Sequence, residues 1–294
     1  ENLGAVSVSD DARNWKRADY LYQHVDVGLT NTPADEEPPF RYNCLTDDWV
    51  QATLQMDITV AQMQPIVVPE IDDLVRITRS SGSTGVPKLI PKTRRSQEYQ
   101  ISMRYKLYGL SYNSNILITG ATFVLNSILI DCQALLSIGA GIINIKDKME
   151  ALIKYKITYI NSLSLNIEHI LNRMPRIAAD LKSRNLLIKI SGAAVSRTLR
   201  EKVEFKLGAK ILSAFGSNEC DSILLMQDPE LGTVHPGTDL EVRDEKHRKV
   251  PDGTAGLIAA RNQGMITGYY KNEEETRKRF HNGWFYTGDA GIMV

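Results

Sequence analysis

The feature that most constrains this chain is a regular alternation of strand-length and helix-length segments between residues 74 and 214. Short apolar runs typical of strands are followed by longer segments with helical periodicity. Strands separated by helices of this length are typical of βαβ units, which build a mainly parallel sheet with helices on both faces. The predicted strands cover residues 74–78, 115–119, 141–145, 157–161, 186–190 and 209–214, and the predicted helices cover 94–108, 125–137, 146–156, 165–174 and a segment that Ser196 opens.

Beyond residue 222 the pattern changes to short extended pieces separated by glycines and prolines, which is typical of an antiparallel unit. One helix interrupts it, with Asn272 as the N-cap and Glu275 three residues later. Residues 1–70 show little periodicity and are expected to be part of the core or a truncated subdomain. The expected fold class is therefore α/β, with mainly parallel sheets flanked by helices over 71–221 and a smaller β-rich subdomain over 222–294.

Composition excludes several classes of partner. Thirty-five Lys and Arg residues balance 35 Asp and Glu residues, so whole-molecule attraction to nucleic acid or to an anionic membrane is not expected. The apolar stretch 121–145 is long enough to cross a bilayer, but Asp131 would be costly there, so a buried helix and a buried strand are expected instead of membrane insertion. Three widely separated cysteines without metal-ligand spacing predict a reducing, cytoplasmic setting.

A loop rich in glycine and hydroxyl side chains, Ser80 to Lys88, directly follows the first predicted strand. Its glycines allow successive backbone N–H groups to turn inward, its hydroxyls donate to oxyanions, and Lys88 supplies a positive charge. Phosphate is the natural ligand of such a loop, and a flexible surface turn is the alternative interpretation. No Gly-Lys-Ser/Thr run closes the loop before a helix, which disfavours an ordinary P-loop NTPase.

Four later segments favour a nucleotide over a surface turn. Ser191 to Ala194 ends one predicted strand with small residues, which lets a flat ring approach the backbone. Phe215 to Glu219 ends the next strand with an aromatic ring, a turn and a carboxylate. In open parallel sheets, ligands bind at these carboxyl ends of the strands. The segments Gly264 to Tyr269 and Tyr286 to Asp289 complete the series.

In this order the motifs resemble those of the adenylate-forming superfamily, which includes acyl-CoA synthetases, nonribosomal peptide synthetase adenylation domains and firefly-type luciferases. The resemblance covers residues 74–294. It implies an AMP-forming ligase that uses ATP and Mg²⁺ to activate a small-molecule carboxylic acid as an acyl-adenylate, with release of pyrophosphate. The acyl group would then pass to a thiol, either of coenzyme A (CoA) or of the phosphopantetheine on an acyl or peptidyl carrier protein.

The resemblance also implies roles for individual residues. Lys88, Asn218 and Glu219 would be catalytic, with Glu219 as the Mg²⁺ ligand, and Asp289 would accept from both ribose hydroxyls. Phe215 takes the place of a tyrosine that stacks on adenine. The residues matched to the ATP or AMP site are Ser81, Gly82, Ser83, Thr84, Gly85 and Lys88 around the phosphates, Gly192, Ala193 and Ala194 beside adenine, and Phe215, Gly216, Ser217, Asn218 and Asp289. The acid pocket would include Phe123, Val124, Asn126 and Ser127.

Three positions depart from the family pattern. Leu89 stands where the phosphate loop ends in glycine, and Asn218 replaces a threonine near the α-phosphate. Because Asn still donates a hydrogen bond, altered rather than absent binding is expected. Val124 stands where amino-acid-activating members have an aspartate, and an unpaired ammonium in a buried pocket is costly, so an acid without an α-amino group is expected.

The family's C-terminal domain, with a lysine used in adenylation, does not follow Val294, so a truncated chain or a degenerate homologue is expected. The rival function is a nucleotide- or acyl-adenylate-binding domain with weak catalysis. A third possibility, an ordinary doubly wound metabolic domain, predicts no nucleotide affinity. Residues 92–95 are expected to be a solvated face at a helix start, with attraction of phosphate as the less favoured alternative. Residues 273–275 are expected to act only as a helix cap.

Overall fold

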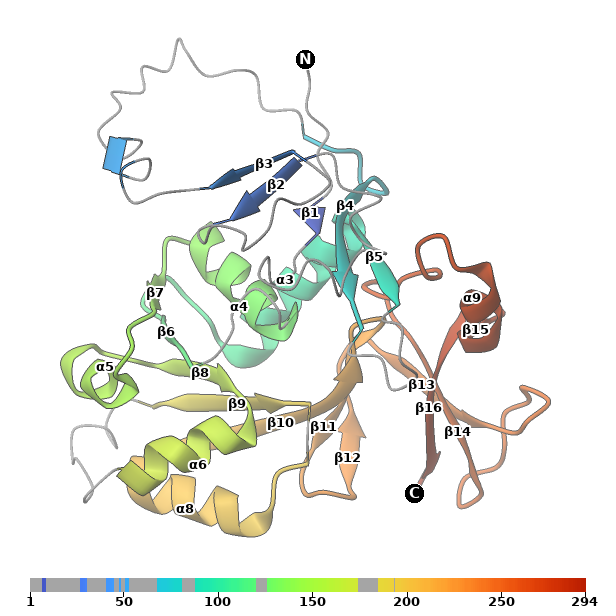
Figure 1. The fold of residues 1–294 in the computed structure, drawn as a ribbon. Helices are drawn as coiled ribbons and strands as arrows, with labels where there is room; N and C mark the ends of the chain where they lie inside the picture. The colour runs from blue at the N-terminus through green and yellow to red at the C-terminus, as the bar shows by residue number, and fades with distance from the viewer. Residues whose placement is uncertain are drawn as a thin grey trace.

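A computed structural model of the chain describes residues 7–8, 27–30, 41–44, 48, 51–52, 68–80, 88–119, 126–173, 185–192 and 194–294. Its largest element is a seven-stranded sheet (Figure 1) with the strand order β12-β11-β10-β9-β8-β6-β7. The five strands from β10 to β7 run parallel. The strand β11 pairs antiparallel with β10, and β12 pairs antiparallel with β11. The strands are β6 (Asn115–Ile118), β7 (Gly141–Ile143), β8 (Tyr159–Ser162), β9 (Leu187–Ser191), β10 (Lys210–Ser217), β11 (Asp221–Met226) and β12 (Gly232–Val234).

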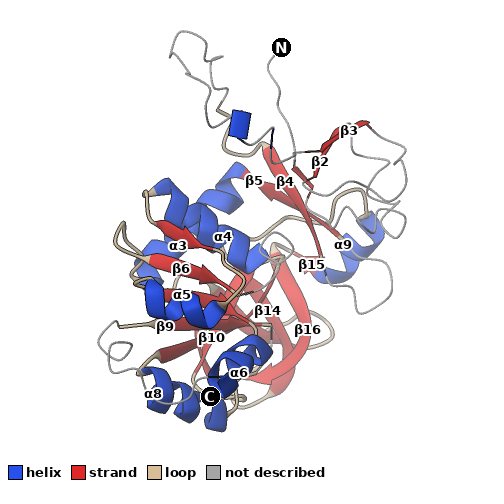
Figure 2. Ribbon diagram, turned by 60° about the vertical axis from the view of Figure 1, so that its left-hand side comes forward, coloured by secondary structure: helices blue, strands red, loops and turns tan. Residues whose placement is uncertain are grey.

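Helices cover both faces of this sheet, as the alternation in the sequence predicts (Figure 2). Successive residues of β6 point to opposite faces, because strand side chains alternate. Ile116 and Ile118 pack in one apolar cluster with α3 and α4, whereas Leu117 packs in the other cluster with α5, α6 and α8. The helices are α3 (Arg94–Tyr108), α4 (Asn126–Ser137), α5 (Lys148–Lys154), α6 (Ser164–Arg173) and α8 (Arg197–Leu207). The expected α/β fold class is confirmed.

The ends of α8 follow from local chemistry. The side chain of Ser196 accepts a hydrogen bond of 3.2 Å from the backbone N–H of Leu199 at the start of α8, as the sequence predicts. Gly208 ends the helix with φ 59°, a left-handed conformation that favours glycine. Because both caps are local, the position of this helix could be predicted without knowledge of its tertiary contacts.

A second sheet lies beside the first and carries the phosphate-loop segment. It has the order β1-β4-β5, with β4 and β5 antiparallel. The strand β5 was not predicted, because Pro91 lies within it and lacks a backbone donor. At the edge of this sheet, the missing donor is tolerated. The strands are β1 (Ser7–Val8), β4 (Leu74–Arg79) and β5 (Leu89–Thr93).

The C-terminal part forms an antiparallel sheet with the order β13-β14-β16-β15, next to the short helix α9. The expectation that a new sheet begins at residue 222 is wrong. The strands β11 and β12 still pair with the seven-stranded sheet, and only the strand direction changes there. The division into domains otherwise stays a prediction. The elements are β13 (Asp239–Arg243), β14 (Ala255–Arg261), α9 (Glu273–Arg279), β15 (Phe280–His281) and β16 (Trp284–Ile292), and β2 (Val27–Thr30) pairs in parallel with β3 (Arg41–Cys44).

The apolar stretch noted in the sequence is internal. Its described part, residues 126–145, forms α4 followed by β7, as expected. Asp131 is fully buried in α4. Within the described ranges, we find no helix with the length and apolar character needed to cross a membrane.

Candidate nucleotide-binding site

The two ends of the predicted phosphate loop are fixed to each other. The backbone N–H of Ser80 donates to the carbonyl of Lys88 at 2.9 Å, and the N–H of Lys88 donates to Oγ of Ser80 at 3.0 Å. These bonds continue the pairing of β4 with β5, in which Arg79 lies opposite Leu89. The loop therefore connects the two strands of a hairpin, and Lys88 lies directly before β5.

Tyr269 joins two of the predicted catalytic residues. Its phenolic oxygen donates a hydrogen bond of 2.8 Å to Oε1 of Glu219, and the centre of its ring lies 5.0 Å from Nζ of Lys88. Burial, together with the neighbouring Glu219 carboxylate, raises the pKa of Tyr269, so the phenol remains a donor at neutral pH. Lys88 and Glu219 thus lie next to the same aromatic side chain.

Lys88 forms an ion pair with Glu275, with 2.7 Å between Nζ and Oε2. Glu275 lies in the first turn of α9, and hydrogen bonds from Lys88 and Lys278 lower the pKa of its carboxyl to about 2. The expectation that residues 273–275 only cap this helix is therefore wrong for Glu275. Any phosphate that binds Lys88 has to compete with this carboxylate.

Asn218 and Glu219 lie in the turn that joins β10 to β11. Nδ2 of Asn218 donates to the carbonyl of Arg79 at 3.2 Å, next to the end of β4. The turn needs glycine at position 216, because a Cβ atom on Gly216 would lie only 2.1 Å from the carbonyl oxygen of Asp221. The turn therefore brings Asn218 and Glu219 to the hairpin that carries the phosphate loop.

The two segments predicted to border adenine are neighbours. β9 and β10 are parallel, and Ser191 lies opposite Ala214, so Gly192 and Phe215 follow at adjacent strand ends. Gly192 is exposed and has φ 86°, where glycine is favoured. Phe215 is partly buried, and Ala194 is exposed. The exposed glycine and the half-buried ring thus lie side by side at the carboxyl ends of these strands.

Asp289 is exposed on β16 and is linked to α9 through the preceding residues of the same strand. The N–H of Asp289 donates to Oγ1 of Thr287 at 3.1 Å, and Nη1 of Arg279 donates to the carbonyl of Thr287 at 3.0 Å. Gly288 has φ 93°, and a Cβ atom there would lie 2.1 Å from Nη1 of Arg279. Since Arg279 ends the helix whose first turn pairs with Lys88, one short helix connects the predicted ribose and phosphate contacts.

Glu219 has the chemistry of a ligand for a magnesium ion that is held mainly by phosphates. Among the residues that the structure describes, no group of three His, Cys, Asp or Glu side chains could hold a metal by itself. Mg²⁺ commonly binds one or two carboxylates together with substrate phosphates and waters. Oε1 of Glu219 accepts from Tyr269, which fixes the carboxylate and leaves its second oxygen for an ion.

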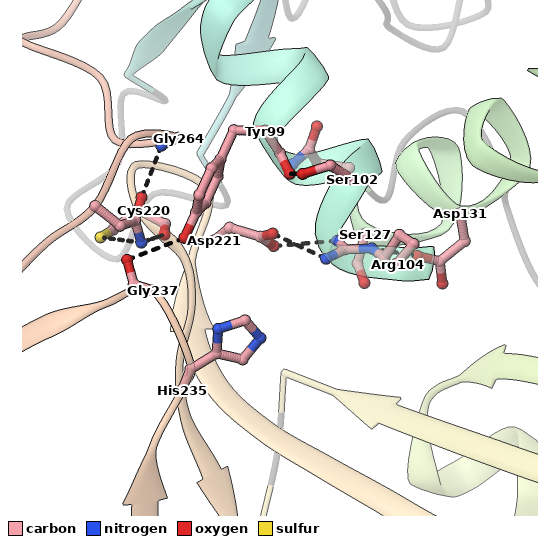
Figure 3. A network of polar contacts seen from close by, with 12 residues as sticks. Tyr99, Ser102, Arg104, Ser127, Asp131, Cys220, Asp221, His235, Gly237 and Gly264 are labelled. Atoms are coloured by element: carbon pink, nitrogen blue, oxygen red, sulfur yellow. Dashed lines mark hydrogen bonds and ion pairs between the residues drawn. The ribbon is translucent and has the colours of Figure 1, made fainter. Parts of the chain in front are cut away.

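A network of buried charges lies between α3, α4 and the central sheet (Figure 3). Arg104 donates to Asp131 at 2.6 Å and to both carboxylate oxygens of Asp221, at 2.9 and 3.1 Å. Burial opposes ionisation of Asp221, but Arg104 outweighs it and lowers the pKa of this carboxyl to about 2. Nζ of Lys189 lies 3.8 Å from Asp131, and the hydroxyl of Tyr159 donates to Asp131 at 2.7 Å. The network is a fixed structural element beside the predicted acid pocket.

Asn126 and Ser127, the described members of the predicted acid pocket, lie in the first turn of α4 against this network. Oγ of Ser127 accepts from Asn161 at 2.9 Å and from Nζ of Lys189 at 3.0 Å. Oδ1 of Asn126 accepts from Nη2 of Arg76 at 2.7 Å. This end of the helix is therefore surrounded by buried donors rather than by apolar side chains alone.

Sequence reasoning gave no role to Arg76, and it named Tyr269 only as the end of the segment Gly264 to Tyr269. The expectation that Lys92 belongs to a solvated face is wrong, because its side chain is fully buried in β5. Nζ of Lys92 donates to the carbonyl of Asn218 at 2.5 Å, and burial lowers the pKa of Lys92 to about 8. The available signal was the placement of Arg76 between apolar residues of a predicted strand.

The remaining predicted residues lie outside the part of the chain that the structure describes, and their roles stay predictions. They are Ser81, Gly82, Ser83, Thr84 and Gly85 of the phosphate loop, Ala193 beside adenine, and Phe123 and Val124 of the acid pocket. Gly216 and Ser217 are described and lie on β10, but their contact with a nucleotide also stays a prediction.

Comparison with known proteins shows the family of the chain. Residues 14–270 match the family described as AMP-binding enzyme, and the chain belongs to this family. A long-chain-fatty-acid–CoA ligase from Escherichia coli O6:H1 (strain CFT073) is 24% identical over 247 residues, which are 79% of this chain and 44% of the ligase. The chain spans about half the length of the curated relatives it matches.

Solved structures share the fold. An O-succinylbenzoate coenzyme A synthetase from Bacillus subtilis, in complex with ATP and magnesium ion, aligns with a TM-score of 0.78 and 17% identity, over 99% of this chain and 62% of that chain. The N-terminal domain of FACL13 from Mycobacterium tuberculosis aligns with a TM-score of 0.82 and 20% identity, over 100% of this chain and 78% of that domain. The α/β architecture is thus that of the N-terminal part of these enzymes.

Proposed function

We propose that this chain is the nucleotide-binding part of an AMP-forming ligase, which uses ATP to activate a carboxylic acid as an acyl-adenylate and releases pyrophosphate. The observation that carries the proposal is that Lys88 and Glu219 both contact the side chain of Tyr269, at the base of the predicted phosphate loop. A cation for phosphates and a carboxylate for a metal are the two groups that an ATP site needs.

The reaction would be an in-line attack of a substrate carboxylate oxygen on the α-phosphorus of ATP. No general base is needed, because a carboxylic acid is already ionised near neutral pH. Lys88 would hold the departing pyrophosphate, and Glu219, oriented by Tyr269, would hold Mg²⁺. The ion would neutralise charge on the phosphates. Catalysis by the chain would therefore rest on positioning and electrostatic stabilisation.

A thiol would accept the acyl group in the complete enzyme. The relatives named as CoA ligases support coenzyme A as the acceptor. Phosphopantetheine on a carrier protein has the same thiol chemistry and remains the other acceptor in the proposal. The acid itself would be a small molecule without an α-amino group, bound at the first turn of α4, where Asn126 and Ser127 lie.

The direct test is calorimetric binding of ATP in the presence of Mg²⁺ to the wild-type chain and to Glu219→Gln. The amide keeps the shape of the side chain but removes the charge that would hold the ion. We expect Glu219→Gln to weaken Mg²⁺-dependent ATP binding by at least roughly tenfold. The matched control is Glu201→Gln on the exposed side of α8, which should bind ATP as the wild type does. Equal affinities of Glu219→Gln and the wild type would remove Glu219 from the metal role.

The second candidate is a domain that binds a nucleotide or an acyl-adenylate with little turnover. The ion pair between Lys88 and Glu275 favours it, because in this arrangement the loop lysine is already neutralised. Binding of ATP and of a non-hydrolysable acyl-sulfamoyl adenosine, measured beside pyrophosphate release, separates the two candidates. Tight binding of both ligands without acid-dependent release would support the second candidate.

A further inference from the structure

Arg76 and Lys92 place two buried positive charges directly opposite each other. They are paired positions on the antiparallel strands β4 and β5. Arg76 is 3% exposed and Lys92 is 0% exposed. Like charges directly opposite each other destabilise a strand pair, and removal from water adds to that cost. Such a pair requires a compensating negative charge.

The described residues supply no carboxylate to either cation. Nη2 of Arg76 donates to the neutral amide of Asn126, whereas its Nε and Nη1 are buried without a hydrogen-bond partner. Nζ of Lys92 donates to the backbone carbonyl of Asn218. Within the described part of the chain, neither side chain lies within ion-pair distance of an acid. The guanidinium therefore keeps strong donors for a group that is not part of these elements.

Among the described residues, the carboxylates closest in effect to Lys92 already have hydrogen-bond partners. Asp221 and Glu219 are the carboxylates whose charge acts on Lys92. Both oxygens of Asp221 accept from Arg104, and Glu219 accepts from Tyr269. Movement of either carboxylate toward Lys92 would break a buried hydrogen bond. The described carboxylates therefore do not neutralise this pair, and an anionic ligand would do so.

The position of the pair favours the acid substrate over the phosphates as the source of this anion. Three residues along the ladder separate the Arg76–Lys92 pair from the Arg79–Leu89 pair at the base of the phosphate loop. At about 3.4 Å per residue, this separation is roughly 10 Å. Arg76 itself donates a hydrogen bond to Asn126 in the predicted acid pocket.

We propose that Arg76 and Lys92 form a buried oxyanion subsite that binds a second acidic group of the substrate, a carboxylate remote from the one that is activated. This inference rests on the proposed function, because it assigns the substrate class of the same site. A dicarboxylic acid would neutralise both cations. A monocarboxylic acid of equal length would leave them unpaired, and buried donors without an acceptor discriminate strongly against such an analogue.

The test compares matched acids on the wild-type chain and on variants. Succinate and butyrate have the same chain length, and malonate and propionate form a second matched pair. Binding is measured by calorimetry and by the shift in thermal unfolding, in the presence and absence of ATP and Mg²⁺. Arg76→Met and Lys92→Met remove one cation each. Their controls are Arg95→Met, which removes an exposed arginine paired with Asp72, and Lys202→Met on the exposed side of α8.

We expect the wild type to bind each dicarboxylate more tightly than its matched monoacid, and Arg76→Met to reduce this preference by roughly 10- to 100-fold, the effect of one buried charged hydrogen bond. Lys92→Met should reduce it as well, and both controls should retain it. Equal binding of mono- and dicarboxylates by the wild type would overturn the subsite. So would a preference that survives in both variants. If one variant does not fold, the other decides.

Two further measurements separate this inference from the proposed function. ATP affinity should be unchanged in Arg76→Met, because the phosphates are bound elsewhere. A wild-type chain that binds no ATP would contradict the proposed function, whereas the dicarboxylate preference would still decide the subsite. Inorganic phosphate is the third probe. If phosphate binding is lost in Arg76→Met while the succinate preference is kept, the anion is a phosphate and the carboxylate assignment is wrong.

Discussion

The hydroxyl of Tyr269 lies 2.8 Å from Oε1 of Glu219, and this bond orients the carboxylate proposed to hold magnesium. The two residues are 50 positions apart in the sequence, on either side of the antiparallel sheet strands β13 and β14. Both side chains are buried, at 6% and 8% exposure. A hydrogen bond between them is therefore protected from competition with water, and it limits the orientations of the carboxylate.

We predict that Tyr269→Phe raises the Mg²⁺ concentration needed for half-maximal ATP binding by roughly tenfold. Outer-shell partners of metal ligands typically contribute 10- to 100-fold to metal affinity. The ring remains, so packing near Lys88 is preserved. The measurement is a magnesium titration at fixed ATP, followed by calorimetry. Tyr112→Phe, on an exposed tyrosine, is the control. An unchanged magnesium midpoint in Tyr269→Phe would show that Tyr269 does not support the metal site.

The ion pair between Lys88 and Glu275 yields a prediction of opposite sign. Glu275→Gln removes the carboxylate that competes with phosphate for Lys88. A partly exposed ion pair contributes less than about 1 kcal/mol, so ATP affinity should increase by a factor of roughly two to five. Glu274→Gln is a closely matched control, because Glu274 is on the same helix and pairs with Lys278. Weaker ATP binding by Glu275→Gln would mean that Glu275 positions Lys88 rather than competing for it.

Much of the fold could be predicted from the sequence because its signals are local. The alternation of apolar runs and helical segments defines the central sheet, and Ser196 and Asn272 cap the helices α8 and α9 as their positions predict. The turn over Asn218 and Glu219 follows a predicted strand. At the carboxyl end of a parallel strand, such a turn has a ligand-binding position that the fold class determines.

The parts that could not be predicted depend on tertiary contacts. Lys92 follows a proline and precedes a helix, so its sequence neighbourhood is typical of a surface segment. Its burial results from pairing with β4, which places it opposite Arg76. The contact of Tyr269 with Glu219 joins two distant segments, and no spacing pattern in the sequence predicts it. Similarly, Glu275 fits the pattern of a helix cap, and only the fold brings Lys88 to its side chain.

The buried charge network should make a large contribution to stability only as a complete unit. Arg104→Met would remove the guanidinium that pairs with both Asp131 and Asp221. Removal of one member of a buried pair typically costs about 3–5 kcal/mol. We expect a loss of this order in the free energy of unfolding, measured with urea at pH 7. Arg95→Met, which breaks a fully exposed pair with Asp72, should cost far less, because water and salt screen such a pair. Similar losses in the two variants would mean that the network is solvated.

The same network predicts a loss of stability at low pH. Because the pKa of Asp221 is held at about 2 in the folded protein and is near 3.8 otherwise, its contribution is present above pH 3.8. It is lost as the pH falls toward 2. Arg104→Met removes the main charge that lowers this pKa, so the difference in unfolding free energy between wild type and variant should narrow below pH 4.

Lys92 leads to a second pH dependence, of the same sign but at alkaline pH. Burial lowers its pKa from 10.5 to about 8 in the folded protein, and Arg76 adds to the shift. Below pH 8 the lysine is protonated in both states, so its cost to folding is constant. Between pH 8 and 10.5 the unfolded chain binds one proton more than the folded chain, and the free energy of unfolding therefore rises with pH. The slope is about 1.4 kcal/mol per pH unit, for a total on the order of 3 kcal/mol.

Lys92→Met should abolish this rise. The difference between the free energies of unfolding of Lys92→Met and the wild type should therefore decrease steadily from pH 8 to pH 10.5, whatever its value at pH 7. The absolute value at pH 7 also includes the carbonyl of Asn218, which loses its donor in the variant, so the slope is the informative quantity. Urea unfolding at half-unit pH steps measures it. Lys202→Met, on an exposed lysine, should give a difference that is flat with pH. A flat difference for Lys92→Met as well would mean that Lys92 remains hydrated, and the charge repulsion invoked for the Arg76 pair would then be absent.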